Sequence, residues 1–219
     1  MASLLTRRNE HVAAAVAHLR DADPRLNWLI DRAGPFTLKI ERDRYAMLVR
    51  SILSQQISTK AARSIRLKLE VAVGGLTPTA IAAAPETTLR GAGLSNQKVN
   101  YLRDLTEHVI DGRLTLDRLH RLEDEAVIEQ LIAVKGIGRW TAQMFLMFSL
   151  GRLDIFPHDD LGIRASMREL YGLEELPNKA QCLELAAPWR PFSTIASWYI
   201  WRLSDLKSDP TMDASRYPV

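Results

Sequence analysis

Apolar residues recur at intervals of three and four along most of the 219-residue chain. This spacing places them on one face of a helix, and no segment shows the convincing two-residue alternation of a half-buried strand. Only Phe36–Ile40 suggests a short extended piece. The pattern predicts an all-α protein with helices at Glu10–Arg20, Leu26–Asp31, Arg44–Leu53, Thr59–Val71, Pro78–Ala83, Glu86–Gly91, Gln97–Asp111, Leu116–Arg121, Asp124–Val134, Arg139–Leu150, Leu161–Leu170, Lys179–Ala187 and Phe192–Leu203.

Short clusters of glycine or proline separate these predicted helices. They include Gly74-Gly75, Gly91-Ala92-Gly93, Gly136-Ile137-Gly138 and Phe156-Pro157. From Ser204 onward the chain is rich in Asp, Ser and Pro, which predicts a frayed end over 204–219. The sequence contains no long linker, internal repeat or low-complexity tract. We therefore expect a compact molecule with two helical lobes.

The composition is that of a water-soluble globular protein, with 47% hydrophobic and 25% charged residues. No apolar run reaches the roughly 18 residues of a membrane-spanning helix, and no apolar segment follows the arginines of Met1–Asn9 as a signal peptide requires. The single cysteine, Cys182, excludes an internal disulfide, a cysteine-based zinc site and a four-cysteine iron–sulfur cluster. We expect a reducing, cytoplasmic environment. The net charge of +3 is a weak indication of an anionic partner.

Two glycines, Gly136 and Gly138, make Leu131–Ala142 the most informative segment. One predicted helix runs into them and another begins directly afterwards. Glycine leaves the backbone bare, so N–H groups here and at the start of the second helix can bind an anion such as phosphate. Lys135 and Arg139 flank the turn with positive charge. A plain turn with a glycine C-cap is the alternative, but apolar residues around the turn favour a hairpin suited to sequence-independent binding of the DNA backbone.

Asp159 and Asp160 stand where a helix begins, because Pro157 stops any helix before them. Asp is a favoured N-cap, and that role alone is enough to explain either residue. The positive end of the helix dipole also favours a negative charge there. A carboxylate held beside a DNA sugar can stabilise the oxocarbenium charge that develops as an N-glycosidic bond breaks, and it can orient water. Its place after the hairpin favours this second role.

The run Val134–Ala142, followed by Asp154–Leu161, resembles the helix-hairpin-helix DNA glycosylases, above all the 3-methyladenine type of bacteria and yeast. The similarity extends through roughly Tyr45–Leu203 and includes Ile52–Ser58, Trp189–Phe192 and Trp198–Trp201. The resemblance implies a bilobal fold with the active-site cleft between two helical subdomains. One subdomain would comprise 1–40 and 156–219, and the other 41–155, with the hairpin at 131–149.

By this resemblance Asp160 is the catalytic residue and Asp159 is structural. Trp140, Met144 and Trp201 would form the base pocket. An indole face attracts a stacked cation, and alkylation of a ring nitrogen makes a purine cationic. Met144 replaces a residue that is often aromatic in bacterial relatives, which makes the pocket more pliable and leaves the substrate preference open. Core packing is the alternative for both tryptophans, and we assign to the core Trp28, Trp189 and Trp198.

Gln56 matches the family residue that enters the duplex where the flipped base was. Ser58 matches a DNA contact and also suits the N-cap of the next helix. The DNA-binding residues implied are Gln56, Ser58, Lys135, Gly136, Ile137, Gly138, Arg139 and Thr141. Hairpin carbonyls in the family can ligate a monovalent cation, and those of Ile132, Val134 and Ile137 would do so here. No cofactor is required, and we expect no iron–sulfur cluster.

Members of this superfamily that also cut the strand carry a lysine nucleophile directly after Gly-x-Gly-Arg, where this chain has Trp140. Relatives with an extra N-terminal sheet domain have a longer segment before the matched region. We predict a monomeric, monofunctional glycosylase without AP lyase activity. It would remove alkylated purines (3-methyladenine, 7-methylguanine) from damaged double-stranded DNA in base excision repair, at the nucleoid if the source is bacterial. A glycosylase for another lesion or mispair, and a non-catalytic helix-hairpin-helix protein, are the alternatives.

Overall fold

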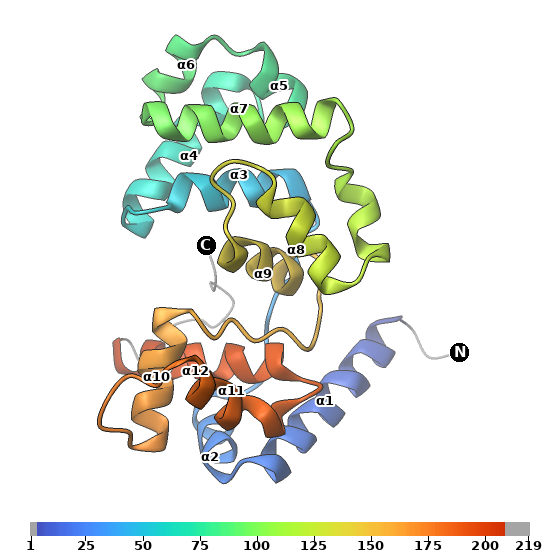
Figure 1. Ribbon diagram of the computed structural model, residues 1–219, viewed down its shortest axis with the longest axis vertical. Helices are drawn as coiled ribbons and strands as arrows, with labels where there is room; N and C mark the ends of the chain where they lie inside the picture. The colour runs from blue at the N-terminus through green and yellow to red at the C-terminus, as the bar shows by residue number, and fades with distance from the viewer. Residues whose placement is uncertain (1–3, 209–219) are drawn as a thin grey trace. The chain divides into compact units, whose positions relative to one another are not determined.

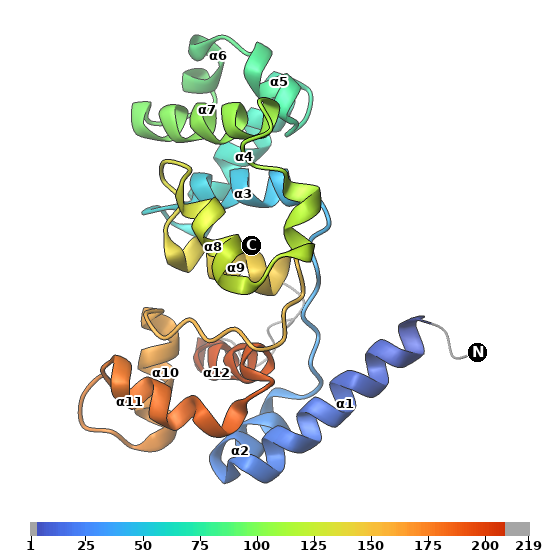
Figure 2. The same ribbon diagram turned by 45° about the vertical axis from the view of Figure 1, so that its right-hand side comes forward.

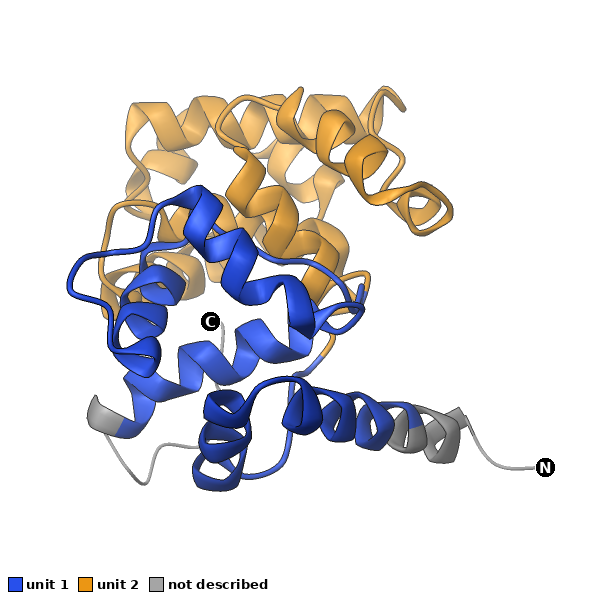
Figure 3. Cartoon of the chain, turned by 60° about the horizontal axis from the view of Figure 1, so that its bottom comes forward, with its two compact units in different colours: residues 1–39, 151–218 blue, residues 40–150, 219 orange. Residues whose placement is uncertain are grey.

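The structure, a computed structural model, describes residues 4–208, and every regular element among them is helical (Figure 1). The all-α prediction is therefore confirmed. The chain divides into two compact units, coloured separately in Figure 3. Unit 1 comprises residues 1–39 and 151–218, and unit 2 comprises residues 40–150. The second boundary thus lies at 151, whereas the sequence placed it at 156.

Unit 1 is arranged around its last helix. α12 packs against α1, α2 and α10, and every residue of Ser193–Leu203 is buried. A helix that is covered on all sides in this way forms the centre of a helical unit. The elements of unit 1 are α1 (Leu4–Ala22), α2 (Pro24–Ala33), α10 (Leu161–Tyr171), α11 (Lys179–Ala186), the 3₁₀-helix η2 (Ala187–Trp189) and α12 (Ser193–Ser208).

Asp23 fixes several of these elements together. Its carboxylate caps α2 by accepting the backbone N–H groups of Arg25 and Leu26. It also accepts the Trp189 indole N–H at 3.2 Å and the Tyr171 hydroxyl at the end of α10. Burial, reinforced by the neighbouring carboxylate, raises the pKa of Tyr171. Because a buried carboxylate is tolerated only when its oxygens are bonded, this network holds α10 in a defined orientation.

Unit 2 contains the predicted hairpin. α3 packs against α4, α7 and α9, and both α5 and α6 lie along α7 (Figure 2). Residues Thr141–Phe148 of α9 and the C-cap residue Ser149 are all buried. The elements are α3 (Arg44–Ser54), α4 (Thr59–Val73), α5 (Pro78–Ala83), α6 (Glu86–Gly91), α7 (Asn96–Ile110), the 3₁₀-helix η1 (Leu116–Arg121), α8 (Asp124–Ile132) and α9 (Arg139–Phe148).

The structure corrects several details of the sequence prediction. Phe36–Ile40 pairs with no strand and is irregular. α8 ends at Ile132, two residues before the predicted end, and Leu116–Arg121 is a 3₁₀-helix. The predicted frayed end is wrong for Ser204–Ser208, which continue α12; the rest of it, 209–219, lies outside the described residues. Within residues 4–208 there is no helix with the length and apolar character needed to cross a membrane.

Two of the three tryptophans assigned to the core are buried there. Trp189 and Trp198 are at most 1% exposed, as predicted. The assignment is wrong for Trp28, which is 49% exposed. The guanidinium of Arg32, one turn further along α2, lies 5.2 Å from the centre of the Trp28 ring, so a stacked cation covers part of the indole.

Candidate functional site

Asp160 is the N-cap of α10, and one of its oxygens binds two donors. Oδ1 accepts the backbone N–H of Ile163 at 2.8 Å and the indole N–H of Trp201 at 3.1 Å. The donors belong to different helices, α10 and α12, so the carboxylate is fixed in orientation as well as in position. The N-cap role proposed as the alternative is therefore present. It is compatible with chemistry, because the side chain is only half-buried.

Gly162 borders this carboxylate, and the sequence analysis did not single it out. A Cβ atom at this position would lie 3.1 Å from Asp160 Oδ1 and 3.6 Å from Trp201 Cδ1. The residue belongs to the first turn of α10, where the helical backbone does not require glycine. Glycine here leaves the space beside the carboxylate open. The sequence signal that could have identified Gly162 is that glycine, a poor helix former, occurs inside a predicted helix.

Asp159, the neighbouring carboxylate, has a different environment. Its side chain is 70% exposed, and its Oδ1 lies 3.0 Å from His158 Nδ1. The two adjacent aspartates therefore differ clearly: Asp160 is held by two N–H donors from different helices, whereas Asp159 is mostly exposed and pairs with its neighbour His158. This contrast is useful because one residue can serve as a control for the other.

The hairpin between α8 and α9 presents part of its backbone to solvent. Gly138 is the N-cap of α9, and within residues 4–208 no side chain caps that helix start. Two other hairpin N–H groups are already bonded, that of Ile137 to the Val134 carbonyl and that of Lys135 to Asp104 Oδ2. The best-placed anion donors are thus the N–H groups of Gly138 and the first turn of α9. The Ile137 N–H, which we had included among them, is not.

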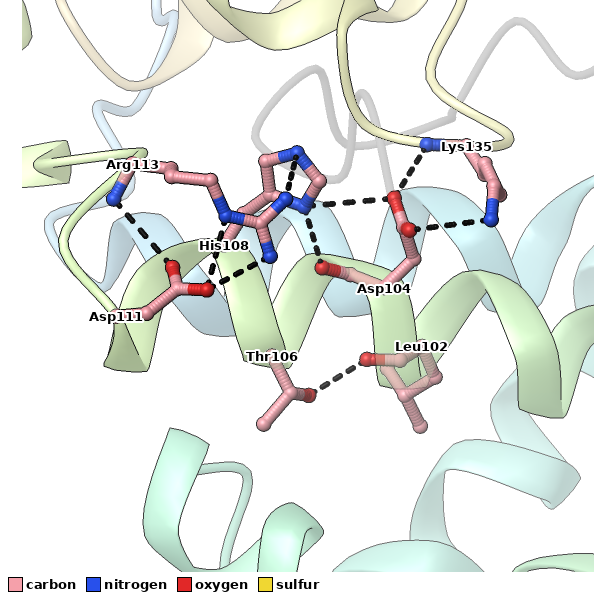
Figure 4. Close-up of polar contacts among 7 residues, drawn as sticks. All are labelled: Leu102, Asp104, Thr106, His108, Asp111, Arg113 and Lys135. Carbon is pink, nitrogen blue, oxygen red and sulfur yellow. Dashed lines mark hydrogen bonds and ion pairs between the residues drawn. The ribbon is translucent and has the colours of Figure 1, made fainter.

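Two side chains of helix α7, which the sequence analysis missed, contact the hairpin turn. A Cβ atom on Gly136 would lie only 2.2 Å from the Tyr101 ring, so the ring packs directly against this glycine. Asp104 accepts the Lys135 N–H at 2.8 Å, and its Oδ1 lies 3.6 Å from Lys135 Nζ. Figure 4 shows the Asp104 carboxylate between Lys135 and His108, whose Nδ1 is 3.5 Å away. The turn is held by contacts that are remote in sequence.

The other residues assigned to the hairpin helix differ in exposure. Arg139 is exposed and pairs with Glu125 of α8. Trp140 is 46% exposed, whereas Thr141 and Met144 are each 5% exposed. Thr141 therefore offers DNA almost no side-chain surface, and that assignment gains no support. Trp140 and Met144 are four residues apart on one face of α9.

The residues of the predicted base pocket come from both units. Trp140 and Met144 belong to unit 2, and Asp160 and Trp201 belong to unit 1. The structure brings Asp160 and Trp201 into direct contact. It shows Trp201 as nearly buried, with 4% of its surface exposed. A pocket shared by all four residues stays a prediction.

The loop between α3 and α4 carries the predicted wedge. Gln56 is exposed and has a positive φ of 57°, the only such value for a non-glycine among the described residues. Ser58 caps α4, because its hydroxyl oxygen accepts the Ala61 N–H at 3.3 Å. The N-cap role considered for Ser58 is therefore confirmed, and a DNA contact of this residue stays a prediction.

Comparison with known proteins identifies the family. A family model described as "HhH-GPD superfamily base excision DNA repair protein" matches residues 49–191. The chain is 37% identical over 199 residues to DNA-3-methyladenine glycosylase 1 of Schizosaccharomyces pombe, which covers 88% of this chain and 87% of that protein.

Solved structures show the same relationship. A DNA-3-methyladenine glycosidase of Bacillus halodurans has a TM-score of 0.79 at 37% identity, covering 92% of this chain and 93% of that one. A 3-methyladenine DNA glycosylase of S. pombe in complex with abasic DNA has a TM-score of 0.81 at 34% identity, covering 90% and 98%. As the sequence resemblance predicted, the chain belongs to the HhH-GPD superfamily of base excision DNA repair proteins.

Proposed function

We propose that this protein is a monofunctional DNA glycosylase that hydrolyses the N-glycosidic bond of alkylated purines in double-stranded DNA. The observation that carries the proposal is Asp160, whose carboxylate is fixed by donors from two helices in a chain 37% identical to a DNA-3-methyladenine glycosylase. A protein that only bound the DNA backbone would have no use for such a carboxylate, because it repels phosphates.

The chemistry follows from the charge of the substrate. A purine methylated at a ring nitrogen carries a positive charge, so it leaves as a neutral base when the bond between C1′ and the purine nitrogen breaks and the electron pair goes to the purine. The sugar then develops oxocarbenium character, which a fixed carboxylate stabilises. Water adds its oxygen to C1′ and gives up a proton, which Asp160 would accept. The products are the free base and an abasic site.

Binding to undamaged DNA would depend on the hairpin. The N–H groups of Gly138 and the first turn of α9 bind a phosphate, and Lys135 and Arg139 add positive charge. The carbonyls of Ile132, Val134 and Ile137 would hold a monovalent cation, which would add a fixed positive charge near that phosphate. These carbonyls fit the role: α8 ends at Ile132, so carbonyls of its last turn lack helical partners. Within residues 4–208 the Val134 oxygen accepts one backbone N–H, that of Ile137 at 3.1 Å.

We also propose that the enzyme does not cut the DNA strand. Strand cleavage through a Schiff base needs an amine, and Trp140, which follows Gly136-Ile137-Gly138-Arg139, has none. The nearest lysine in sequence, Lys135, precedes the turn and pairs with Asp104. A cytoplasmic location and a monomeric state belong to the same proposal. Cys182 is a free thiol, buried against the Pro177 carbonyl, and burial raises its pKa, as expected of a structural cysteine.

One experiment tests the function and the absence of lyase activity together. Duplex DNA treated with a methylating agent is incubated with the protein, and released bases are identified by chromatography. We expect 3-methyladenine and 7-methylguanine in solution and an intact abasic strand that breaks only in alkali. Borohydride added during turnover should trap no protein–DNA adduct. If only another base is released, the protein is a glycosylase for a different lesion. If no base is released, the protein is a DNA-binding member of the family. A trapped adduct contradicts the monofunctional mechanism.

Trp201 should affect excision through two separable properties. Its N–H donates to Asp160, and its ring face would attract a cationic base. Trp201→Phe keeps an aromatic face but loses the N–H, so it should slow release of charged and neutral bases alike, by roughly three- to tenfold. Trp201→Ala should add a further loss that is larger for 7-methylguanine than for neutral hypoxanthine. Single-turnover rates at saturating enzyme check this, and equal losses for both bases in the alanine variant would refute the stacking role.

A further inference from the structure

A side-chain hydrogen bond joins the wedge loop to the hairpin. The amide of Gln55 donates from Nε2 to the carbonyl oxygen of Gly136 at 2.8 Å. These residues are 81 positions apart in the sequence, and Gln55 is half-buried. Gln55 directly precedes Gln56, and Gly136 lies in the hairpin turn. The bond therefore connects the two segments to which the proposed function assigns duplex insertion and phosphate binding.

The hairpin end of this bond is rigid. Gly136 has a φ of +84°, and the Tyr101 ring leaves no room for any side chain at this position. The N–H of the same peptide, that of Ile137, donates to the Val134 carbonyl at 3.1 Å, and one residue before Gly136 the Asp104 carboxylate accepts the Lys135 N–H. Tyr101 and Asp104 are three residues apart, so they project from one face of α7. The Gly136 carbonyl is thus a fixed anchor.

The loop end of the bond carries backbone strain. Gln56 has a φ of 57°, and a left-handed conformation costs a non-glycine residue about 1–2 kcal/mol. Such a conformation persists only where its surroundings impose it. Here the loop is held before Gln56 by Gln55, and after it by Ser58, which caps α4. Lys98 of α7 adds a third restraint, since its Nζ donates to the Leu53 carbonyl at 2.6 Å.

We propose that Gln55 is a positioning residue that couples the hairpin to the wedge. By binding the Gly136 carbonyl, Gln55 holds Gln56 in its strained conformation in the free protein. The free energy needed to order the loop therefore does not add to the free energy of base extrusion. Hairpin and wedge then bind DNA as one preformed unit. This inference rests on the proposed function, in which the hairpin binds phosphate and Gln56 enters the duplex. It assigns to Gln55 no contact with DNA of its own.

The test compares Gln55→Leu and Gln55→Glu, which keep the size of the side chain but remove the amide donor, with a matched control. Gln97→Leu is the control, because the Gln97 amide donates to the Tyr101 hydroxyl at 2.5 Å and not to the hairpin backbone. We expect both Gln55 variants to lower the single-turnover excision rate by about tenfold, as for the loss of one good hydrogen bond. A 2-aminopurine placed beside the lesion should report weaker extrusion to the same degree. For Gln55→Leu, affinity for undamaged duplex should change less than about twofold, because the phosphate contacts remain; Gln55→Glu also adds a negative charge that repels phosphate, so this comparison uses the leucine variant.

A double-mutant cycle shows whether Gln55 acts through Gln56. Gln56→Ala should slow excision by itself, and Gln55→Leu should then have little further effect. If Gln55→Leu slows the Gln56→Ala protein as much as it slows the wild type, the coupling is refuted. The coupling is also refuted if Gln55→Leu weakens binding to undamaged DNA as much as it slows excision.

Hydrogen exchange on the free protein separates this inference from the proposed function. Amides of residues 55–58 should exchange faster in both Gln55 variants than in the wild type, and at the wild-type rate in Gln97→Leu. Unchanged exchange in the Gln55 variants overturns the coupling even if the wild type is an active glycosylase. Conversely, a wild type that releases no base overturns the proposed function, while faster exchange would still support the structural coupling.

Discussion

Replacing Asp160 with asparagine should slow base release at least about a hundredfold while the protein stays folded. Asparagine is as good an N-cap as aspartate. Its amide oxygen can still accept the Ile163 N–H and the Trp201 indole N–H, which both bind one oxygen in the wild type. The negative charge is lost, and that charge is what stabilises the developing oxocarbenium ion. The rate is measured in single-turnover excision of 7-methylguanine, and folding is checked by thermal unfolding.

Asp159→Asn provides the matched control, since it makes the same chemical change one residue earlier. The Asp159 side chain is 70% exposed and pairs with His158, so removing its charge should change the free energy of unfolding by less than about 1 kcal/mol and leave excision near the wild-type rate. Excision by Asp160→Asn at the wild-type rate would remove the central claim. If Asp159→Asn lost most of its excision activity and Asp160→Asn lost none, the roles of the two aspartates would have to be exchanged.

The helices could be predicted because their signals are local. α4 begins directly after Ser58, whose hydroxyl caps it, and ends at Gly74, which adopts the left-handed conformation of a C-cap. α10 likewise begins after Asp160 and ends at Gly172. The exact end of α8 was misjudged, because Val134 continues the apolar pattern into the turn. Its carbonyl there accepts the Ile137 N–H, a bond of the turn that periodicity does not reveal.

The candidate site could be predicted only in part. Asp160 and the glycines of the hairpin were found because each breaks a helical pattern at a recognisable place. Tyr101, Asp104 and Gln55 were not found, because their roles depend on contacts with Lys135 and Gly136 across tens of residues. The residues next to a glutamine or a tyrosine in the sequence do not indicate such a remote partner. The assignment of Trp28 was wrong for the opposite reason: an apolar residue in an amphipathic helix was assumed to be buried, but Trp28 is half-exposed and Arg32 lies over part of its ring.

Gly136 and Gly138 should respond very differently to alanine. Gly136→Ala should destabilise the protein by about 2–4 kcal/mol, since it combines a positive φ of 84° with a methyl group 2.2 Å from the Tyr101 ring. Gly138→Ala should cost about 1 kcal/mol or less, because Gly138 has a φ of −93° and a Cβ there meets nothing within 4 Å. Chemical denaturation measures both values.

DNA binding, in contrast to stability, should be sensitive to the alanine substitution at Gly138. Gly138→Ala keeps the fold but places a methyl group beside the N–H groups at the start of α9. It should therefore weaken binding to undamaged duplex by about tenfold and reduce the salt dependence of binding, because a phosphate contact is lost. Unchanged affinity and salt dependence would show that phosphate does not approach the hairpin at Gly138.

The contribution of Tyr101 can be isolated by repeating the Gly136→Ala substitution in a Tyr101→Ala background. Removing the ring removes the steric conflict but leaves the positive φ, so the cost of Gly136→Ala should fall to about 1–2 kcal/mol. Asp104 still holds the Lys135 N–H in this background, so the turn keeps one of its two supports from α7. If Gly136→Ala costs as much without the ring as with it, backbone conformation alone requires the glycine, and α7 supports the hairpin through Asp104 and not through Tyr101.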